Sequence, residues 1–149
     1  MPDNNTFGLV EIIQRDHREV EQMLGAVESA SGDVRRRAFG DLAEKLKAHE
    51  AAEQKVVHPL TADEGDAAEA RALREEESAA SAALEKLEGL DVDSAEFERG
   101  FARLKADVLA HAHEEERDEH PRLEQETPAD ELERRGRMFE DAEREAAGS

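Results

Sequence analysis

The sequence predicts an all-α protein, an up-down-up-down antiparallel four-helix bundle with a short fifth C-terminal helix. Helix-favouring residues dominate the composition, which includes only five Phe and no Trp, Tyr or Cys. Large apolar residues recur every three or four positions, which is the period of one helix face. Turn-forming residues separate these segments at regular intervals, as is typical of long helices joined by short loops.

Breakers and caps delimit the first two helices. The first helix is expected over about residues 8–28, and the segment 31–33 (Ser-Gly-Asp) ends it and caps the second. The second helix is expected to reach His58 and to stop there, because Pro59 disfavours helical backbone at the residue before it. Residues 61–65 would then form a polar loop.

The remaining helices begin at residues that favour helix N-termini. The third helix, over about residues 66–88, opens at Asp66, and the fourth, over about residues 93–122, opens at Asp93. Each aspartate has a glutamate three positions later, which completes a possible capping box. Pro128 lies just inside a short fifth helix that ends near residue 146. We expect this fifth helix to form a lid or an end cap.

Length and charge limit the class of protein. A chain of 149 residues is expected to form a single domain, with the bundle over about residues 8–123. The net charge of −19 argues against nucleic acid and against anionic membrane surfaces as partners. No segment approaches the ~20 apolar residues of a membrane span, and the N-terminus does not resemble a signal peptide. We therefore expect a cytoplasmic protein, with a monomer favoured.

Polar residues interrupt each of the four apolar stripes near the middle of its helix. They keep the spacing of three and four that their apolar neighbours follow, so they should point into the core. Burying an ionised carboxylate costs several kcal/mol unless it is paired, and three in one core would repel each other. The interrupting residues are His17, His49, Glu53, Glu77, His111 and Glu115.

A pair of divalent cations would satisfy these groups. Two such ions carry four positive charges against the three negative charges of Glu53, Glu77 and Glu115, and a bridging hydroxide or oxide would balance the remainder. A His and a Glu four residues apart share one helix face, about 6 Å apart along the axis. Two metals in a dinuclear site lie ~3.5–4 Å apart, so the His can be a terminal ligand while the Glu bridges. Imidazole and carboxylate ligands without sulfur suit Fe, Mn or Zn.

Other His and Glu residues fall outside the stripes. We expect Glu50, Glu76, Glu114 and Glu116 to be solvated, and His58, His113 and His120 to lie off the site. His58 and His120 each precede a proline and are expected to pack at the end of the bundle, with a metal or proton-relay role as the alternative. For the stripe residues themselves, the alternatives are a core His bonded to a backbone carbonyl and surface pairing of the Glu residues.

One sequence motif occurs twice, as His49-x3-Glu53-x5-Pro59 and as His111-x3-Glu115-x5-Pro121. Asp16-His17 lies upstream of both copies. On these residues, the chain resembles bacterial hemerythrin-like proteins of the HHE cation-binding family over about residues 9–123. The resemblance implies a four-helix bundle that holds a non-haem di-iron centre. In that family His17, His49 and His111 would be terminal ligands, and Glu53 and Glu115 would bridge the two iron ions.

The third helix departs from the family pattern. The family usually places one or two His there, whereas no His occurs between His58 and His111, and Glu77 stands at the expected position. A site with three His and three Glu would be closer to the carboxylate-rich di-iron proteins. Anionic ligands favour ferric iron, which argues against reversible O₂ carriage and favours redox turnover, iron handling or Mn occupancy.

Three hypotheses follow for the function. The first is a non-haem di-iron protein that binds or reduces a small oxidant (O₂, NO or peroxide) or handles iron. The second is a catalase-like enzyme with two iron or two manganese ions. The third is a metal-free helical interaction module, in which His17, Glu53 and Glu115 could become Leu with a gain in stability. The sequence offers no nucleophile constellation and no phosphate loop, so hydrolase and kinase functions have no support.

Overall fold

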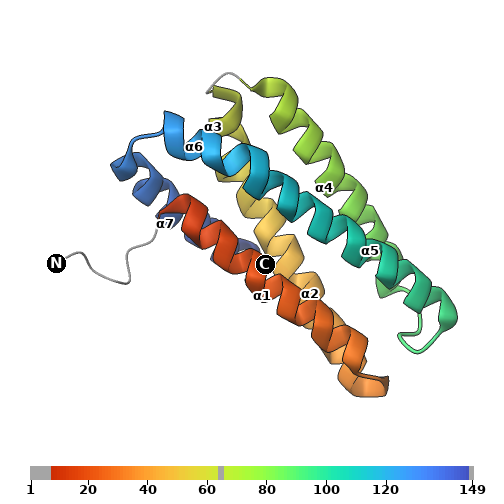
Figure 1. Ribbon diagram of the computed structural model, residues 1–149. Coiled ribbons are helices and arrows are strands. Elements are labelled where there is room, and N and C mark those ends of the chain that lie inside the picture. The colour runs from red at the N-terminus through yellow and green to blue at the C-terminus, as the bar shows by residue number, and fades with distance from the viewer. Residues whose placement is uncertain (1–7, 64–65, 148–149) are drawn as a thin grey trace.

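Helices make up the regular structure of the part of the chain that the structure describes, which confirms the predicted all-α class. The computed structural model describes residues 8–63 and 66–147. Its elements are α1 (Leu9–Ser29), α2 (Gly32–Ala52), η1 (Glu53–Val57), α3 (His58–Asp63), α4 (Ala67–Glu88), α5 (Ala95–Glu114), η2 (Glu115–Glu119), α6 (His120–Glu126) and α7 (Ala129–Ala147). The long helices α1, α2, α4 and α5 run side by side, and α3 and α6 lie at the same end of the molecule (Figure 1).

The fifth helix of the prediction, α7, is neither a lid nor an end cap. It has 19 residues and packs along the sides of α1 and α2. Phe139 is fully buried and Ala142 is 6% exposed, and both join an apolar cluster with residues of α1 and η1. An apolar face that continues along a helix needs a lateral partner, which explains why α7 lies alongside the other helices.

The apolar core consists of two clusters. One joins α1, α2, α4 and α5 around Leu24, Leu42 and Phe97, and the other joins α1, η1, α6 and α7 around Ile13, Val56 and Leu123. Along α1, the residues of the second cluster come first, His17 follows, and the residues of the first cluster begin at Val20. Five of the six polar stripe residues are buried as predicted, and His111 is half-buried, so a polar layer lies between the two apolar clusters.

The sequence predicted the N-terminal cap of α4 correctly and that of α5 incorrectly. The Asp66 side chain accepts a hydrogen bond from the Glu69 N–H (3.0 Å), so the predicted cap of α4 is confirmed. The cap of α5 is Ser94 rather than Asp93, because the Ser94 hydroxyl oxygen accepts from the Phe97 N–H (3.1 Å). Asp93 instead accepts from the Gly32 N–H (3.0 Å) and so joins the two interhelix turns.

The second helix does not stop before Pro59, contrary to the prediction. The five residues of η1 form a π turn, in which the His58 N–H bonds the Glu53 carbonyl five residues back, and α3 then continues through Pro59 to Asp63. A proline in an α-helix clashes with the carbonyl four residues back, and the wider π turn relieves that clash. Of the predicted loop, residues 61–63 are therefore helical, and residues 64–65 lie outside the described ranges.

A π turn also occurs in the second copy of the sequence motif. The π turn η2 begins at Glu115, the His120 N–H bonds the Glu115 carbonyl, and α6 carries the helix through Pro121 to Glu126. The helix predicted to end near residue 122 is thus four residues longer. The repeated sequence encodes a repeated structure, namely a π turn that opens at a core glutamate and ends at a His-Pro pair.

Candidate metal centre

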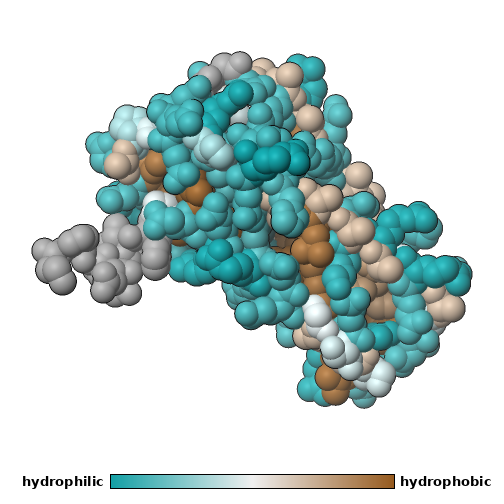
Figure 2. Space-filling view, in the orientation of Figure 1, coloured by the Kyte–Doolittle hydropathy of each residue, from teal (hydrophilic) through white to brown (hydrophobic). Residues whose placement is uncertain are grey.

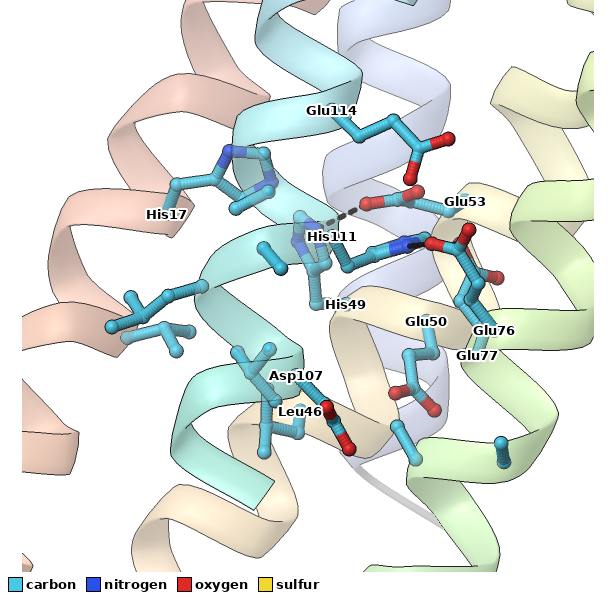
Figure 3. Close-up of a pocket in the computed structure, with 17 residues that line it drawn as sticks. His17, Leu46, His49, Glu50, Glu53, Glu76, Glu77, Asp107, His111 and Glu114 are labelled. Carbon is cyan, nitrogen blue, oxygen red and sulfur yellow. Dashed lines mark hydrogen bonds and ion pairs between the residues drawn. The ribbon is translucent and has the colours of Figure 1, made fainter. Parts of the chain in front are cut away.

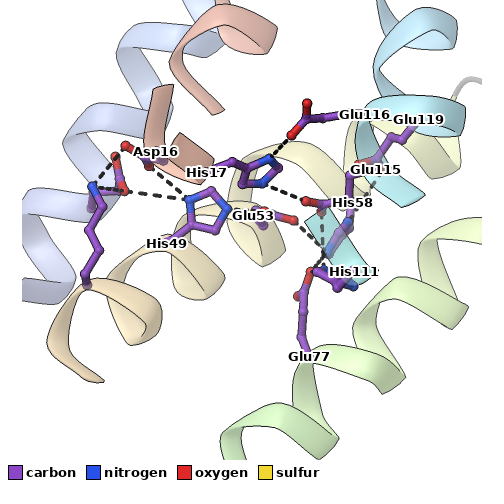
Figure 4. Close-up of polar contacts among 12 residues, drawn as sticks. Asp16, His17, His49, Glu53, His58, Glu77, His111, Glu115, Glu116 and Glu119 are labelled. Atoms are coloured by element: carbon purple, nitrogen blue, oxygen red, sulfur yellow. Dashed lines mark hydrogen bonds and ion pairs between the residues drawn. The ribbon is translucent and has the colours of Figure 1, made fainter. Parts of the chain in front are cut away.

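The six stripe residues converge in the polar layer between the apolar clusters (Figure 4). Glu53, Glu77 and Glu115 are at most 2% exposed, and His17 and His49 are at most 8% exposed. The His111 side chain is 18% exposed. Whether these residues bind metal stays a prediction, but their placement in one buried cluster meets the geometric condition for it. They come from α1 (His17), α2 (His49), η1 (Glu53), α4 (Glu77), α5 (His111) and η2 (Glu115).

The cluster divides into two sets of potential ligands that share two carboxylates. His17 and His49 form one set with Glu53 and Glu115, and Glu77 and His111 form the other set with the same two glutamates. Within each set, the donor atoms all lie within 4.8 Å of one another. Such an arrangement fits two neighbouring cations with two shared carboxylates.

The two oxygens of each shared carboxylate face different sets. Glu115 Oε1 lies 3.1 Å from His17 Nε2, whereas Glu115 Oε2 lies 3.4 Å from His111 Nε2. Glu53 Oε1 contacts His49 Nε2, whereas Glu53 Oε2 points to the opposite side. Ligands about 2.0–2.2 Å from one ion lie about 3 Å apart when they occupy adjacent positions, which matches these distances.

Unpaired polar atoms support the fit of cations to this site. Both carboxylate oxygens of Glu53 and of Glu115, together with His49 Nε2 and Glu77 Oε1, are buried and have no hydrogen-bond partner within residues 8–63 and 66–147. Buried polar atoms without partners are costly, and for charged groups the cost reaches several kcal/mol. Two divalent cations would give each of these atoms a partner, so the donor set fits a dinuclear centre.

Each of the three predicted imidazole ligands has a carboxylate next to its Nδ1 atom, on the side away from the cluster. His17 Nδ1 lies 2.8 Å from Glu116, His49 Nδ1 lies 3.0 Å from Asp16, and His111 Nδ1 lies 2.8 Å from Glu76. A carboxylate that accepts from Nδ1 fixes the ring so that Nε2 points inward, as at many metal sites. Lys45 donates to Asp16 (2.9 Å) from the outside.

Glu76 and Glu116 are exposed, as predicted, but their contacts with the site were not foreseen. Each contacts an imidazole that comes from another helix. Their position next to Glu77 and Glu115, like that of Asp16 next to His17, was the available signal. An acid beside a core residue projects over the edge of the core, where a neighbouring helix can reach it.

Two further histidines are buried, as packing at the end of the bundle would require, but they lie next to the predicted ligands rather than away from the site. His58 is fully buried, with Nε2 at 2.8 Å from Glu77 Oε2. His120 is 1% exposed and stacks on His17 with ring centroids 5.9 Å apart. Since each follows a π turn, it lies one turn beyond the glutamate that opens the turn. His113 is exposed, as expected for a residue off the stripe.

The protonation of the cluster reflects its burial and its crowded charges. Burial, together with repulsion from the Glu115 carboxylate, raises the pKa of Glu53 well above its ordinary value. Burial opposes protonation of His111, but the neighbouring carboxylates of Glu115 and Glu77 outweigh it and raise the pKa of His111 to about 11. Burial likewise opposes protonation of His58, and Glu119 and Glu77 raise its pKa to about 9. Protons therefore occupy positions that cations would take.

A cavity of about 290 Å³ adjoins the cluster (Figure 3). Five of the six predicted ligands line it, and Val20, Leu46 and Val108 form its apolar wall. Its lining includes the exposed residues Ala79 and Asp107, so the cavity opens at the surface beside α4 and α5. The face of the molecule shown in Figure 2 is mostly hydrophilic, with hydrophobic side chains visible at several places between the hydrophilic ones. A small molecule can reach the cluster through such an opening.

Glu50 lines the cavity and is not solvated, contrary to the prediction. It is half-buried, and its carboxylate accepts a hydrogen bond from the Ser81 hydroxyl (2.6 Å). Burial raises its pKa to about 7. Glu114, also expected to be solvated, is half-buried and lines the same cavity.

The fold and the site define a class, the helical proteins with a buried layer of His and Glu that could hold cations. The chain belongs to the hemerythrin family: the model for the Hemerythrin HHE cation binding domain matches residues 8–123. Comparisons with curated proteins and with solved structures gave no match. The helix α7 lies beyond the matched residues. Among the described residues, no helix is long and apolar enough to cross a membrane.

Proposed function

We propose that this chain is a non-haem di-iron protein that binds or reduces a small oxidant such as O₂, NO or peroxide. The observation that carries the proposal is the pair of ligand sets that share Glu53 and Glu115, with the oxygens of each carboxylate facing different sets. In this proposal, His17, His49, Glu77 and His111 are the remaining ligands. The long helices would form the up-down-up-down antiparallel bundle typical of such sites.

When bound, iron supplies the redox chemistry and the affinity for small oxidants. The chain supplies the positions of the ligands and the access route. Asp16, Glu76 and Glu116 hold the imidazoles, while Val20, Leu46 and Val108 keep one side of the cavity apolar. A cavity of about 290 Å³ admits diatomic molecules and peroxide readily.

A second candidate function is peroxide decomposition at a di-iron or di-manganese site. Glu77 favours it, because this carboxylate occupies a helix position where the family usually has histidine, and it faces His111 at 3.0 Å. A third anionic ligand stabilises the oxidised metal and suits manganese as well as iron. Redox turnover is therefore better supported than reversible carriage of O₂.

Metal analysis of the purified protein, combined with an absorption spectrum, tests the proposed site. We expect two metal ions per chain and, with iron, charge-transfer absorption in the near-ultraviolet, where a protein without Trp or Tyr absorbs little. The variant His111→Ala should lose metal, whereas His113→Ala, two residues away and exposed, should retain it. Wild-type protein that binds no iron, manganese or zinc under any loading condition would leave only the metal-free interaction module.

Oxidant assays on the loaded protein separate the two candidates. O₂ evolution from peroxide that disappears in His49→Ala supports the peroxide-decomposing enzyme. A spectral change that appears on adding O₂ or NO to the reduced protein, and that reverses on removing the gas, supports binding without turnover. Oxidation of the reduced protein by O₂ that cannot be reversed by evacuation supports reduction of the oxidant.

A further inference from the structure

We infer that His58 is a fourth imidazole ligand of the centre and binds the cation that Glu77 and His111 hold. This inference rests on the proposed function. It assigns a metal-binding role to a residue that the sequence pattern placed outside the site. In this assignment, His58 adds an imidazole to the second ligand set, in place of the histidine that α4 lacks.

The position of His58 Nε2 carries the inference. This atom lies 2.8 Å from Glu77 Oε2 and 3.8 Å from Glu53 Oε2, while His111 Nε2 lies 3.0 Å from the same Glu77 oxygen. The two imidazoles thus approach one carboxylate oxygen, at distances suited to ligands of a shared ion. His58 is fully buried.

Each of the two shared carboxylates, Glu53 and Glu115, has a different imidazole next to each of its two oxygens. Glu115 presents Oε1 to His17 and Oε2 to His111. Glu53 presents Oε1 to His49 and Oε2 to His58. Each shared carboxylate therefore faces one imidazole on each side, and each cation would have two imidazoles. Without His58, one cation would have two imidazoles and the other only one.

The outer side of His58 also faces a carboxylate, at a longer distance than in the other three imidazoles. Its Nδ1 atom is buried, makes no hydrogen bond to any residue that the structure describes, and lies 3.8 Å from Glu119 Oε2. Glu119 is 1% exposed and accepts a hydrogen bond from the Thr61 hydroxyl (2.6 Å). All four inward imidazoles thus have Nε2 toward the cluster and a carboxylate on the Nδ1 side (Figure 4). A carboxylate that accepts a hydrogen bond from Nδ1 orients a metal-binding imidazole, and Glu119 is the carboxylate nearest to that atom of His58 among those paired with it.

His120 provides an internal comparison. It occupies the same place after η2 that His58 occupies after η1, and it is equally buried. Its Nδ1 lies 3.4 Å from the Gln14 side-chain amide. Among the residues that the structure describes, no carboxylate forms an ion pair with His120, and its Nε2 is buried without a hydrogen-bond partner. The π turn alone therefore does not make a ligand, and the neighbours of His58 distinguish the two residues.

The competing explanation is that His58 only donates a hydrogen bond to Glu77. Scalar coupling in protein loaded with ¹¹³Cd²⁺ separates the two, because coupling between ¹¹³Cd and a ¹⁵N-labelled imidazole requires a direct bond. We expect coupling to Nε2 of His17, His49, His111 and His58, and none to His113 or His120. Coupling to the first three without His58 would overturn the inference, and coupling to none of them would instead overturn the proposed dinuclear site.

Metal titration of variants gives a second, independent test. His58→Gln keeps an N–H that can reach Glu77, so it preserves a hydrogen bond but removes a strong ligand. We expect this variant to bind the first Zn²⁺ as wild type does and the second at least about 100-fold more weakly. His120→Gln, the matched control, should bind both ions with wild-type affinity. If His58→Gln also binds two ions with wild-type affinity, the inference is wrong; circular dichroism of the metal-free variants establishes that both are folded.

Discussion

At the scale of single residues, protons and cations compete for the same atoms. In the metal-free protein, burial and repulsion from the neighbouring Glu115 carboxylate raise the pKa of Glu53 and so favour its protonated form. His58 and His111, with pKa values of about 9 and about 11, also carry protons at neutral pH. A cation can bind only after these protons leave, so the affinity for metal depends on pH.

The first prediction is that metal affinity rises with pH between 6 and 8. Each proton displaced from a group whose pKa lies above the working pH changes the affinity by up to about tenfold per pH unit. Calorimetric titration with Zn²⁺ in two buffers that differ in ionisation enthalpy gives the number of protons released, which we expect to exceed one per chain. An affinity that stays constant across this range would contradict the protonation state described for the cluster.

A second prediction concerns Glu53→Gln in the metal-free protein. Because the pKa of Glu53 is raised in the folded state, wild type loses stability as pH rises above the ordinary glutamate value, and a neutral amide removes that loss. We expect the variant to be more stable by about 1–3 kcal/mol at pH 7 and equal to wild type near pH 4. Urea unfolding at both pH values measures this. The exposed Glu44→Gln on α2 should stay within about 0.5 kcal/mol of wild type throughout.

The sequence predicted the inward residues well and their neighbours poorly. The six stripe residues could be found because a helix period of three and four fixes which face each one occupies. The carboxylates Asp16, Glu76 and Glu116 were not assigned to the site, because each of them contacts an imidazole on another helix. The local sequence pattern does not show how two helices are rotated relative to each other. His58 was missed for a different reason, which belongs to the next scale.

At the scale of elements, one inserted residue in each π turn changes which side chains face the core. A regular α-helix through η1 would leave His58 off the stripe, as the sequence analysis expected, whereas the π turn places it one turn beyond Glu53. The sequence carried a sign of this in its His-Pro pairs, since a proline inside a helix needs a distortion before it. The lateral position of α7 could not be read from its own residues, because the face it covers belongs to α1, α2 and η1.

A third prediction tests the turn between α1 and α2. Gly32 has φ = 59° and its N–H bonds Asp93, so this turn requires the left-handed conformation that glycine adopts without strain. Gly32→Ala should reduce the free energy of unfolding by about 1–2 kcal/mol. Gly40→Ala lies in the same helix, in open space and without positive φ, and should instead raise it by about 0.5–1 kcal/mol. Urea midpoints that shift in the same direction for both variants would contradict this account.

At the scale of the whole molecule, cations and charge determine stability together. The net charge of −19 includes buried carboxylates that repel each other when no cation balances them. A ligand that binds only the folded state adds stability that grows with its concentration, about 2.7 kcal/mol per site at 100 times the dissociation constant. Cations in the polar layer would therefore stabilise the entire chain.

The fourth prediction is that chelation lowers the thermal midpoint. For a chain of this size, 2.7 kcal/mol corresponds to a shift of about 5–10 °C, and two sites give more. Melting curves of the protein with excess Mn²⁺ or Zn²⁺ and with a chelator measure the difference. Glu53→Gln, which lacks a shared carboxylate, should show a much smaller response. Identical midpoints with metal and with chelator in the wild type would argue for the interaction module.

The polar layer that separates the two apolar clusters has a consequence for cooperativity. Each cluster excludes water by itself, but the groups between them gain from hydration whenever cations are absent. Amide hydrogen exchange of the chelated protein should therefore resolve two separately opening regions, one around Phe97 and one around Phe139. Loaded with metal, the same amides should exchange together in a single global event.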